Sequence, residues 1–141
     1  MILRIIQELL LAGLLLYGSI HDIRTHTMPD WIWMGITGIS FLGIRLYDLP
    51  SMLLGAIAVL VIEVPLAVAL KERAIGGADI KLSAAGAFLL GWQKGLTALI
   101  LGLTLSLIVV PIVRRIRHED NRNAFPLVPF LAVGIMTAAL I

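Results

Sequence analysis

The sequence contains no cysteine and few charged residues. Of its 141 residues only 14% are Asp, Glu, Lys or Arg, whereas a typical soluble domain has about a quarter. The lack of cysteine excludes disulfides, thiol catalysis and Cys-ligated zinc. The formal net charge of +2 is too small to indicate a nucleic-acid partner. With 60% hydrophobic residues, the chain is expected to be an all-α polytopic membrane protein with one domain over residues 1–141.

Six apolar stretches are expected to form membrane helices, separated by Pro, Gly and charged residues. They cover approximately residues 5–20, 31–47, 52–70, 77–92, 96–113 and 124–141, with tight turns at 48–51 and 93–95. The first and fourth are shorter than the roughly 20 residues that cross a bilayer core in a helix. The first stretch could also be a secretory signal, but it has no convincing cleavage site, so a membrane helix is favoured.

Lys and Arg are unevenly distributed over the predicted loops. Eight of them lie on one side of the predicted membrane and three on the other. The positive-inside rule places the eight in the cytoplasm and both termini outside, in a cytoplasmic (inner) membrane. In this topology Asp22 and Asp79 both lie at the cytoplasmic boundary.

Asp79 opens the fourth stretch, in the sequence Gly-Gly-Ala-Asp-Ile-Lys-Leu at residues 76–82. A charge at mid-bilayer costs about 2.5–3.5 kcal/mol by insertion scales, so an acid near hydrocarbon is a candidate functional residue. Ser83 and Gly86 share its helical face and would leave a slot beside it. If Asp22 meets Asp79 in a partly dry site, the two would share a proton and could activate a water, as in aspartic peptidases.

Structural interpretations of these acids stay open. Asp22 could be an ordinary interfacial residue, and Asp79 could pair with Lys81 or Arg73. Asp30 competes with Asp22 as the partner acid, although its place in the first turn of a helix is explained by the helix dipole.

Two further charged residues have alternative roles. Glu63, inside the third stretch, either hydrogen-bonds across the bundle near the site or extends toward Lys71. Lys81 either biases the charge of Asp79 or anchors the helix at the interface, and its i+2 spacing favours the anchor. The three histidines form no recognisable ligand pattern, so neither a metal nor another cofactor is expected.

Three stretches resemble the prepilin peptidases, aspartic peptidases that process the precursors of type IV pilins and archaellins. Residues 76–82 resemble their Gly-x-Gly-Asp motif, with Ala78 in place of the second Gly. Residues 21–30, His-Asp-Ile-Arg-Thr-His-Thr-Met-Pro-Asp, resemble the segment that carries their first catalytic Asp. Residues 125–132, Phe-Pro-Leu-Val-Pro-Phe-Leu-Ala, are similar to the Pro-Phe-x-Pro-Phe-Leu-Ala signature of their last helix. The order of the stretches matches along nearly the whole chain.

The resemblance implies that Asp22 and Asp79 are the catalytic pair of a membrane endopeptidase. Its substrate would be a prepilin-like precursor with a short basic leader before a hydrophobic helix, cut on the cytoplasmic side. Besides this precursor, membrane lipid is the expected partner. The cysteine-containing soluble domain of bifunctional members has no counterpart here, so N-methyltransferase activity is not expected. The supporting or substrate-binding candidates are Gly76, Gly77, Ser83, Lys81 and Glu63.

Two other classes of function also fit the residues. Acids at a membrane boundary and a Pro-interrupted helix suit a small proton-coupled carrier, and a non-enzymatic assembly subunit would tolerate Asn at both Asp positions. A peptidase works in detergent, whereas a carrier needs sealed vesicles. An activity assay in detergent therefore distinguishes a peptidase from a carrier.

Overall fold

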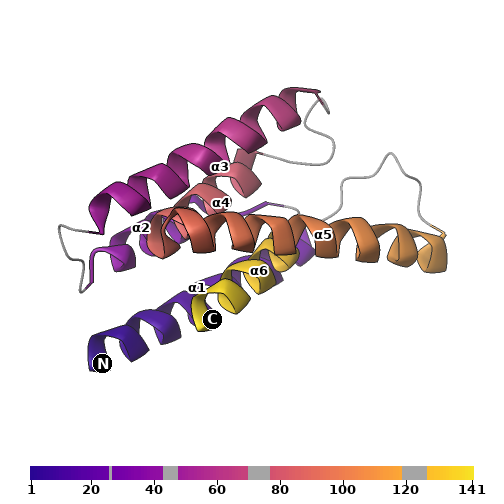
Figure 1. Ribbon diagram of the computed structural model, residues 1–141. Helices are drawn as coiled ribbons and strands as arrows, with labels where there is room; N and C mark the ends of the chain where they lie inside the picture. The colour runs from indigo at the N-terminus through magenta and orange to yellow at the C-terminus, as the bar shows by residue number, and fades with distance from the viewer. Residues whose placement is uncertain (26, 43–47, 70–76, 119–126) are drawn as a thin grey trace.

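The computed structural model is a bundle of six helices, and it describes residues 1–25, 27–42, 48–69, 77–118 and 127–141. Within these ranges there is no strand, which confirms the all-α class. Successive helices run in alternating directions, so α1, α3 and α5 end where α2, α4 and α6 begin (Figure 1). The helices are α1 (Ile2–Thr25), α2 (Asp30–Ser40), α3 (Leu49–Ala69), α4 (Gly77–Leu90), α5 (Trp92–Arg117) and α6 (Val128–Leu140).

The first helix is longer than predicted and the fourth is as short as predicted. α1 continues through residues 21–25, where a polar connection was expected, so the prediction of a short first helix is wrong. In the last turn of α1, the Thr25 hydroxyl donates a hydrogen bond of 2.8 Å to the carbonyl of His21. α4 has 14 residues and begins at Gly77, as predicted.

The predicted turn at residues 93–95 is wrong, because α4 and α5 are separated by Gly91 alone. Gly91 has a φ of +86°, a conformation that glycine adopts without strain. Gly95 lies inside α5 and packs against α4, where an added Cβ would be 2.7 Å from the Cβ of Ala87. The turn predicted at residues 48–51 also lies mostly within a helix, and Pro50 occupies the first turn of α3, a position that suits proline.

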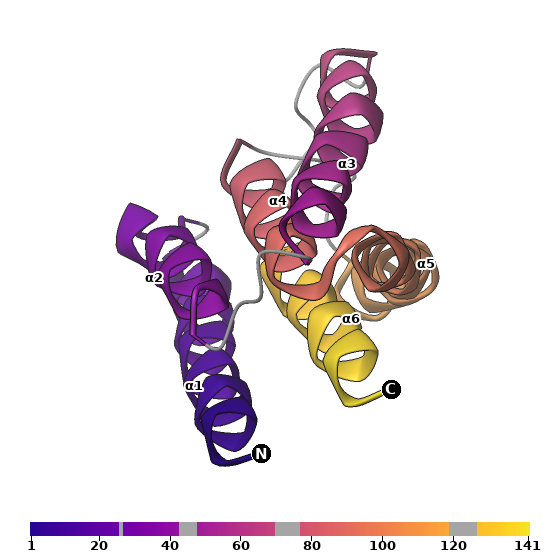
Figure 2. The ribbon, with the colours of Figure 1, turned by 60° about the vertical axis from the view of Figure 1, so that its left-hand side comes forward.

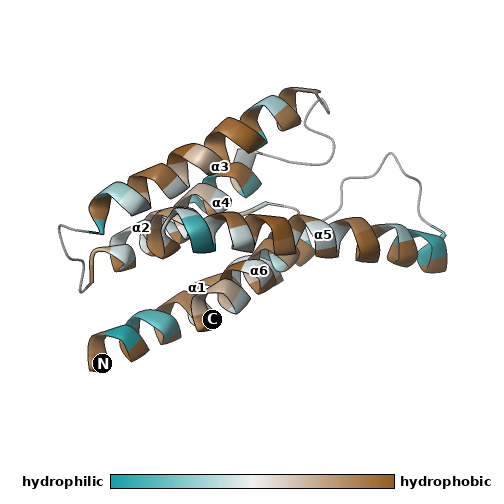
Figure 3. Cartoon of the chain, in the orientation of Figure 1, coloured by the Kyte–Doolittle hydropathy of each residue, from teal (hydrophilic) through white to brown (hydrophobic). Residues whose placement is uncertain are grey.

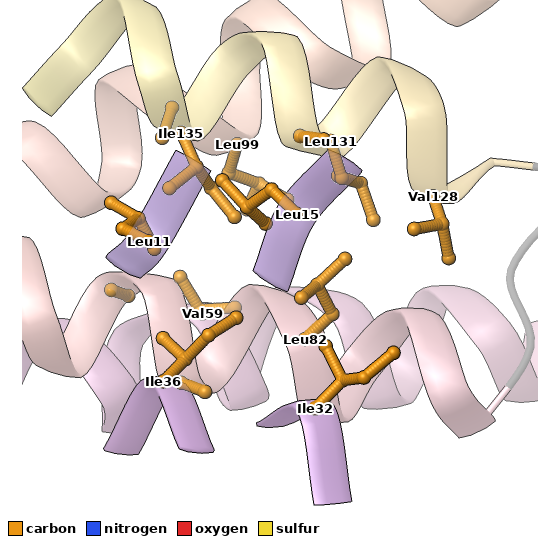
Figure 4. Close-up of a cluster of buried hydrophobic side chains, with 14 of the residues drawn as sticks. Leu11, Leu15, Ile32, Ile36, Val59, Leu82, Leu99, Val128, Leu131 and Ile135 are labelled. Carbon is orange, nitrogen blue, oxygen red and sulfur yellow. The ribbon is translucent and has the colours of Figure 1, made fainter. Parts of the chain in front are cut away.

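The core is built from apolar side chains of all six helices (Figure 4). Its fully buried members recur at helical spacing, so each helix turns one face inward. These residues include Leu11 and Leu15 of α1, Ile32 and Ile36 of α2, Val59 of α3, Leu82 of α4, and Leu131 of α6.

The outward faces are also apolar. Large hydrophobic side chains are exposed along α1, α3 and α5, and these three helices are long and apolar enough to cross a membrane. Hydrophilic residues gather near the ends of α1 and α5, and hydrophobic residues cover the stretches between (Figure 3). A helix that is apolar on both its inward and its outward face is typical of a bundle surrounded by lipid. The protein is therefore a multi-pass membrane protein.

The six helices differ in which neighbours they pack against. In Figure 2, α1 and α2 lie on one side, α3 and α5 on the other, and α4 and α6 between them. Both α2 and α6 pack against α1 and against α4, whereas the described parts of α1 and α4 do not pack directly against each other. α5 and α6 approach most closely at Gly134, where an added Cβ would meet the carbonyl oxygen of Ala98 and lie 2.9 Å from the amide nitrogen of Gly102.

Candidate active site

Both predicted catalytic acids lie at the same end of the bundle. Asp22 is in the last turn of α1 and Asp79 in the first turn of α4. Because α1 and α4 run in opposite directions, these two turns face the same end (Figure 1). The beginnings of α2 and α6, which pack against both helices, complete this end of the bundle.

Asp22 is buried at the beginning of α6. Its side chain is 7% exposed, and its Oδ2 accepts a hydrogen bond of 3.3 Å from the backbone N–H of Val128. Val128 is the first residue of α6, and Pro129 follows it in the first turn. The free N–H groups and the positive end of the helix dipole stabilise a negative charge placed there. This contact explains the burial of Asp22, and whether Asp22 is catalytic or an ordinary interfacial residue stays a prediction.

Asp79 shares its surroundings with a second carboxyl, that of Glu63 in α3. The Glu63 side chain is 0% exposed and the Ser83 side chain is 5% exposed. Ser83 faces the Glu63 carboxyl, and the charge of Asp79 acts on it. The sequence allowed Glu63 to lie near the site or to extend toward Lys71, which is outside the described residues, so the choice between them stays untested. Neither Glu63 oxygen nor the Ser83 hydroxyl has a hydrogen bond of ordinary geometry in the described structure.

Lys81 links α4 to α2. Its Nζ lies 3.4 Å from Oδ1 of Asp30 and 5.8 Å from the ring centroid of Trp33. The indole N–H of Trp33 donates to the same Oδ1 at 3.2 Å. This hydrogen bond, and then the interaction with Lys81, hold the pKa of Asp30 below its usual range. Lys81 and Asp30 thus join α4 to α2, a contact that suits the anchor role that the spacing of Lys81 favours.

Contacts within the first connection hold the end of α1 close to the start of α2. Nδ1 of His21 lies 2.8 Å from the carbonyl oxygen of Thr27. The rings of Tyr17 and Trp31 are 5.2 Å apart between centroids. Trp31 thus joins the beginning of α2 to α1.

The slot expected beside Gly86 is filled. An added Cβ at Gly86 would lie 2.6 Å from Cδ1 of Ile135 in α6, so this glycine serves close helix packing. Gly77, by contrast, is exposed, and among the described residues an added Cβ there would meet nothing within 4 Å. The open space next to Asp79 is therefore at the beginning of α4. Gly76, Lys71 and Arg73 lie outside the described residues, so the predictions for them stay untested.

The sequence did not predict two of the site's contacts. One is the Val128 N–H that binds Asp22, and the other is the Trp33 indole that binds Asp30. Pro129 was a usable signal for the first, because a proline in the first turn marks a helix N-terminus with free N–H groups. No local pattern indicates the second, because Trp at this depth equally suits a membrane interface.

Other parts of the described structure offer less to catalysis. A cavity of about 250 Å³ lies at the opposite end of the bundle, away from both candidate acids. Its lining includes Gln7, Ser40, Asp48, Ser51 and Gly91. In the described part of the chain, no three His, Asp or Glu side chains gather closely enough to hold a metal ion.

Comparison with known proteins gives the family. The type IV leader peptidase family model matches residues 9–111, a span that includes Asp22 and Asp79. A prepilin leader peptidase/N-methyltransferase of Pectobacterium carotovorum subsp. carotovorum is 32% identical over 134 residues, which cover 89% of this chain and 48% of that protein. The chain thus spans about half the length of this relative. No solved structure matches the chain. The match over most of the sequence shows that the chain belongs to the type IV leader peptidase family.

Proposed function

We propose that the protein is an aspartic endopeptidase that removes the leader of prepilin-like precursors at the cytoplasmic face of the inner membrane. The observation that carries this proposal is that Asp22 and Asp79, both within the family match, lie at one end of the bundle on the terminal turns of two helices. Residues 1–141 would form a single peptidase domain.

The surroundings of the two acids suggest different roles for them. Asp22, which accepts the Val128 N–H at the positive end of α6, is suited to be the ionised base. Asp79, at the beginning of α4 beside the exposed Gly77, is assigned the role of the acid. In the proposed reaction Asp22 takes a proton from water, and the water oxygen bonds to the scissile carbonyl carbon. Asp79 protonates the carbonyl oxygen, which gives a gem-diol. Asp22 then passes the proton that it took from water to the leaving amine as the C–N bond breaks, and Asp79 takes its proton back from a gem-diol hydroxyl.

The exposed glycine at the beginning of α4 suggests where the peptide enters. Gly77 has open space around its Cα and precedes Asp79 by two residues. The described parts of α1 and α4 do not pack against each other, so an extended segment of the precursor would lie between Asp22 and Asp79. The cut would then fall at the membrane boundary, with the hydrophobic helix of the precursor in lipid.

The proposed membrane arrangement has six spans with both termini outside. The alternating helix directions support an even number of crossings. The chain has no cysteine, so single cysteines can be introduced and tested with a membrane-impermeant thiol reagent. A cysteine at Thr27 should be protected in intact cells and labelled after lysis, whereas a cysteine at Gln93 should be labelled in intact cells. The reverse pattern would contradict the orientation.

Cleavage of a precursor in detergent tests the activity. We expect Asp22→Asn and Asp79→Asn each to lower the cleavage rate by about 10²–10⁴-fold, the usual contribution of a positioned acid or base. Asp48→Asn is the matched control, because Asp48 is exposed at the opposite end of the bundle. Full activity of either site variant, with the helical content intact, would contradict the proposal.

The same preparation separates a peptidase from a proton-coupled carrier. Cleavage by purified protein in detergent, with no ion gradient, supports the peptidase. If no precursor is cut and the protein in sealed vesicles instead moves a solute with protons, the carrier is the better interpretation.

A further inference from the structure

His21 stands directly before Asp22 near the end of α1, and its side chain binds the backbone that follows the helix. Its Nδ1 lies 2.8 Å from the carbonyl oxygen of Thr27, six positions later in the chain. A carbonyl oxygen can only accept a hydrogen bond, so this geometry assigns the ring proton to Nδ1. His21 is therefore a donor that ties the end of α1 to the segment leading into α2.

The hydroxyl of Thr25, the last residue of α1, agrees with this assignment. It donates to the carbonyl of His21 at 2.8 Å and lies 3.0 Å from Nδ1 of the same residue. Because a hydroxyl has a single proton, that proton is not available to Nδ1. The Thr25 hydroxyl also lies 2.9 Å from the hydroxyl of Thr27, which is then the donor of this pair. Three polar side chains thus close the end of the helix.

Ring and apolar contacts hold the same segment against α1. The ring of Tyr17, one turn before His21, stacks on the imidazole with 6.1 Å between centroids and 28° between planes. Met28 is buried, and its sulfur would lie 3.8 Å from a Cβ added at Gly18. Gly18 and Asp22 share one face of the helix, because they are four residues apart. Residues 27–28 therefore fold back along the face of α1 that carries the acid.

Asp22 needs this support because of its place in the helix. The last four carbonyl groups of a helix have no partner within it, so the last turn opens more easily than the turns before it. Asp22 lies in that turn, and its carboxylate accepts the backbone N–H of Val128, which belongs to α6. Opening of the turn would move the carboxylate away from this donor.

We propose that His21 is a positioning residue that holds the last turn of α1 closed and so keeps the Asp22 carboxylate in its catalytic position. His21 acts through the hydrogen bond that Nδ1 donates to Thr27, and it exchanges no proton with the substrate. This proposal rests on the proposed function of Asp22.

The first test separates the donor of His21 from its ring in precursor cleavage in detergent. His21→Phe keeps the ring that stacks on Tyr17 but has no N–H, whereas His21→Asn has no ring but carries an amide N–H close to the position of Nδ1. We expect His21→Phe to lower kcat by about threefold to tenfold, the factor that one hydrogen bond supplies, with KM unchanged. His21→Asn should keep kcat within about twofold of the wild type.

The matched control is His118→Ala, because His118 is exposed directly after the end of α5, and it should leave kcat unchanged. Two outcomes would overturn the proposal. If His21→Phe cuts as fast as the wild type, the hydrogen bond does not position Asp22. If His21→Asn is as slow as His21→Phe, the imidazole itself takes part in the reaction. His21→Ala replaces His21→Phe in this comparison if the latter does not fold.

Hydrogen exchange, followed by mass spectrometry of the purified protein, tests the inference without a precursor. His21→Phe should speed the exchange of the backbone amides in the last turn of α1 by about threefold to tenfold, whereas His21→Asn should exchange as the wild type does. Equal exchange in all three proteins would overturn the inference even if the precursor is cut and the proposed function holds. If no precursor is cut, faster exchange in His21→Phe alone upholds the role of His21 at Asp22 although the proposed function fails.

Discussion

The two interfaces on either side of the α4–α5 hairpin share close glycine contacts but differ in their buried polar groups. In α3 an added Cβ at Gly55 would lie 2.7 Å from the carbonyl oxygen of Ala87 in α4. Between α5 and α6, glycines bring the backbones into contact, and an added Cβ at Gly134 would lie 2.9 Å from the amide nitrogen of Gly102. Between α3 and α4, a buried carboxyl and a buried hydroxyl, those of Glu63 and Ser83, face each other without a hydrogen bond in the described structure. The first arrangement maximises contact, whereas the second accepts a cost in stability. The comparison teaches that close packing alone explains the α5–α6 interface, whereas the buried polar groups between α3 and α4 need another explanation.

The largest effect is expected at the α5–α6 contact. Gly134→Leu would force the two backbones apart and should lower the free energy of unfolding in detergent by about 3 kcal/mol. Gly13→Leu is the matched control, because an added Cβ at Gly13 meets nothing within 4 Å. Equal stability of the two variants would contradict the close contact.

A smaller effect is expected where α4 meets α6. At Gly86 the three atoms nearest to an added Cβ all belong to the flexible side chain of Ile135, so Gly86→Ala should lower the free energy of unfolding by about 1 kcal/mol. Ile135→Val removes the methyl group that is closest. In a double-mutant cycle, the two changes together should cost less than the sum of the single changes. Strict additivity would indicate that the two residues do not touch.

Removing the unpaired hydroxyl should stabilise the protein. Ser83→Ala abolishes a buried hydroxyl without a hydrogen bond in the described structure and should raise the free energy of unfolding by up to about 1 kcal/mol. The control is Ser106→Ala, because the Ser106 hydroxyl donates to the carbonyl of Leu103 at 2.8 Å. The thermal unfolding temperature should be highest for Ser83→Ala, intermediate for the wild type and lowest for Ser106→Ala. A Ser83→Ala variant that is less stable than the wild type would show that the Ser83 hydroxyl has a hydrogen bond.

The smallest effect is expected at the exposed Asp30–Lys81 pair. The Trp33 hydrogen bond and Lys81 hold the pKa of Asp30 below its usual range. Its contribution to stability is therefore fully present above the usual Asp pKa and is lost as the pH falls through the lowered value. The stability difference between wild type and Asp30→Asn should follow this pH dependence and shrink at high salt. If the stability difference between the wild type and Asp30→Asn instead grows as the pH falls, the prediction is contradicted.

Much of the fold follows from the sequence because lipid demands long apolar helices. Six apolar stretches predicted six helices, and each predicted stretch overlaps the corresponding helix. The helix ends were predicted less well. The composition of residues 93–95 is typical of a turn, but these residues lie in the first turn of α5. The chain already reverses at Gly91, which has a positive φ.

The sequence singles out both acids of the candidate site and several residues near Asp79, but not the contact of Asp22. Asp22 and Asp79 could be singled out because an acid near hydrocarbon needs a reason. The Val128 N–H that binds Asp22 comes from a residue 106 positions later in the chain, and a backbone donor leaves no mark in the side-chain pattern. The slot expected at Gly86 is closed because small residues serve close helix packing as readily as ligand binding.

The meeting of the two helix ends can be measured directly in this cysteine-free chain. In membranes that contain an uncut precursor, the double variant Asp22→Cys/Asp79→Cys should be joined by a short bifunctional thiol reagent. The variant Asp22→Cys/Asp48→Cys, with its second site at the opposite end of the bundle, should not be joined. If Asp22→Cys/Asp79→Cys is labelled at both cysteines but never joined, with or without the precursor, the two acids do not act on one peptide bond.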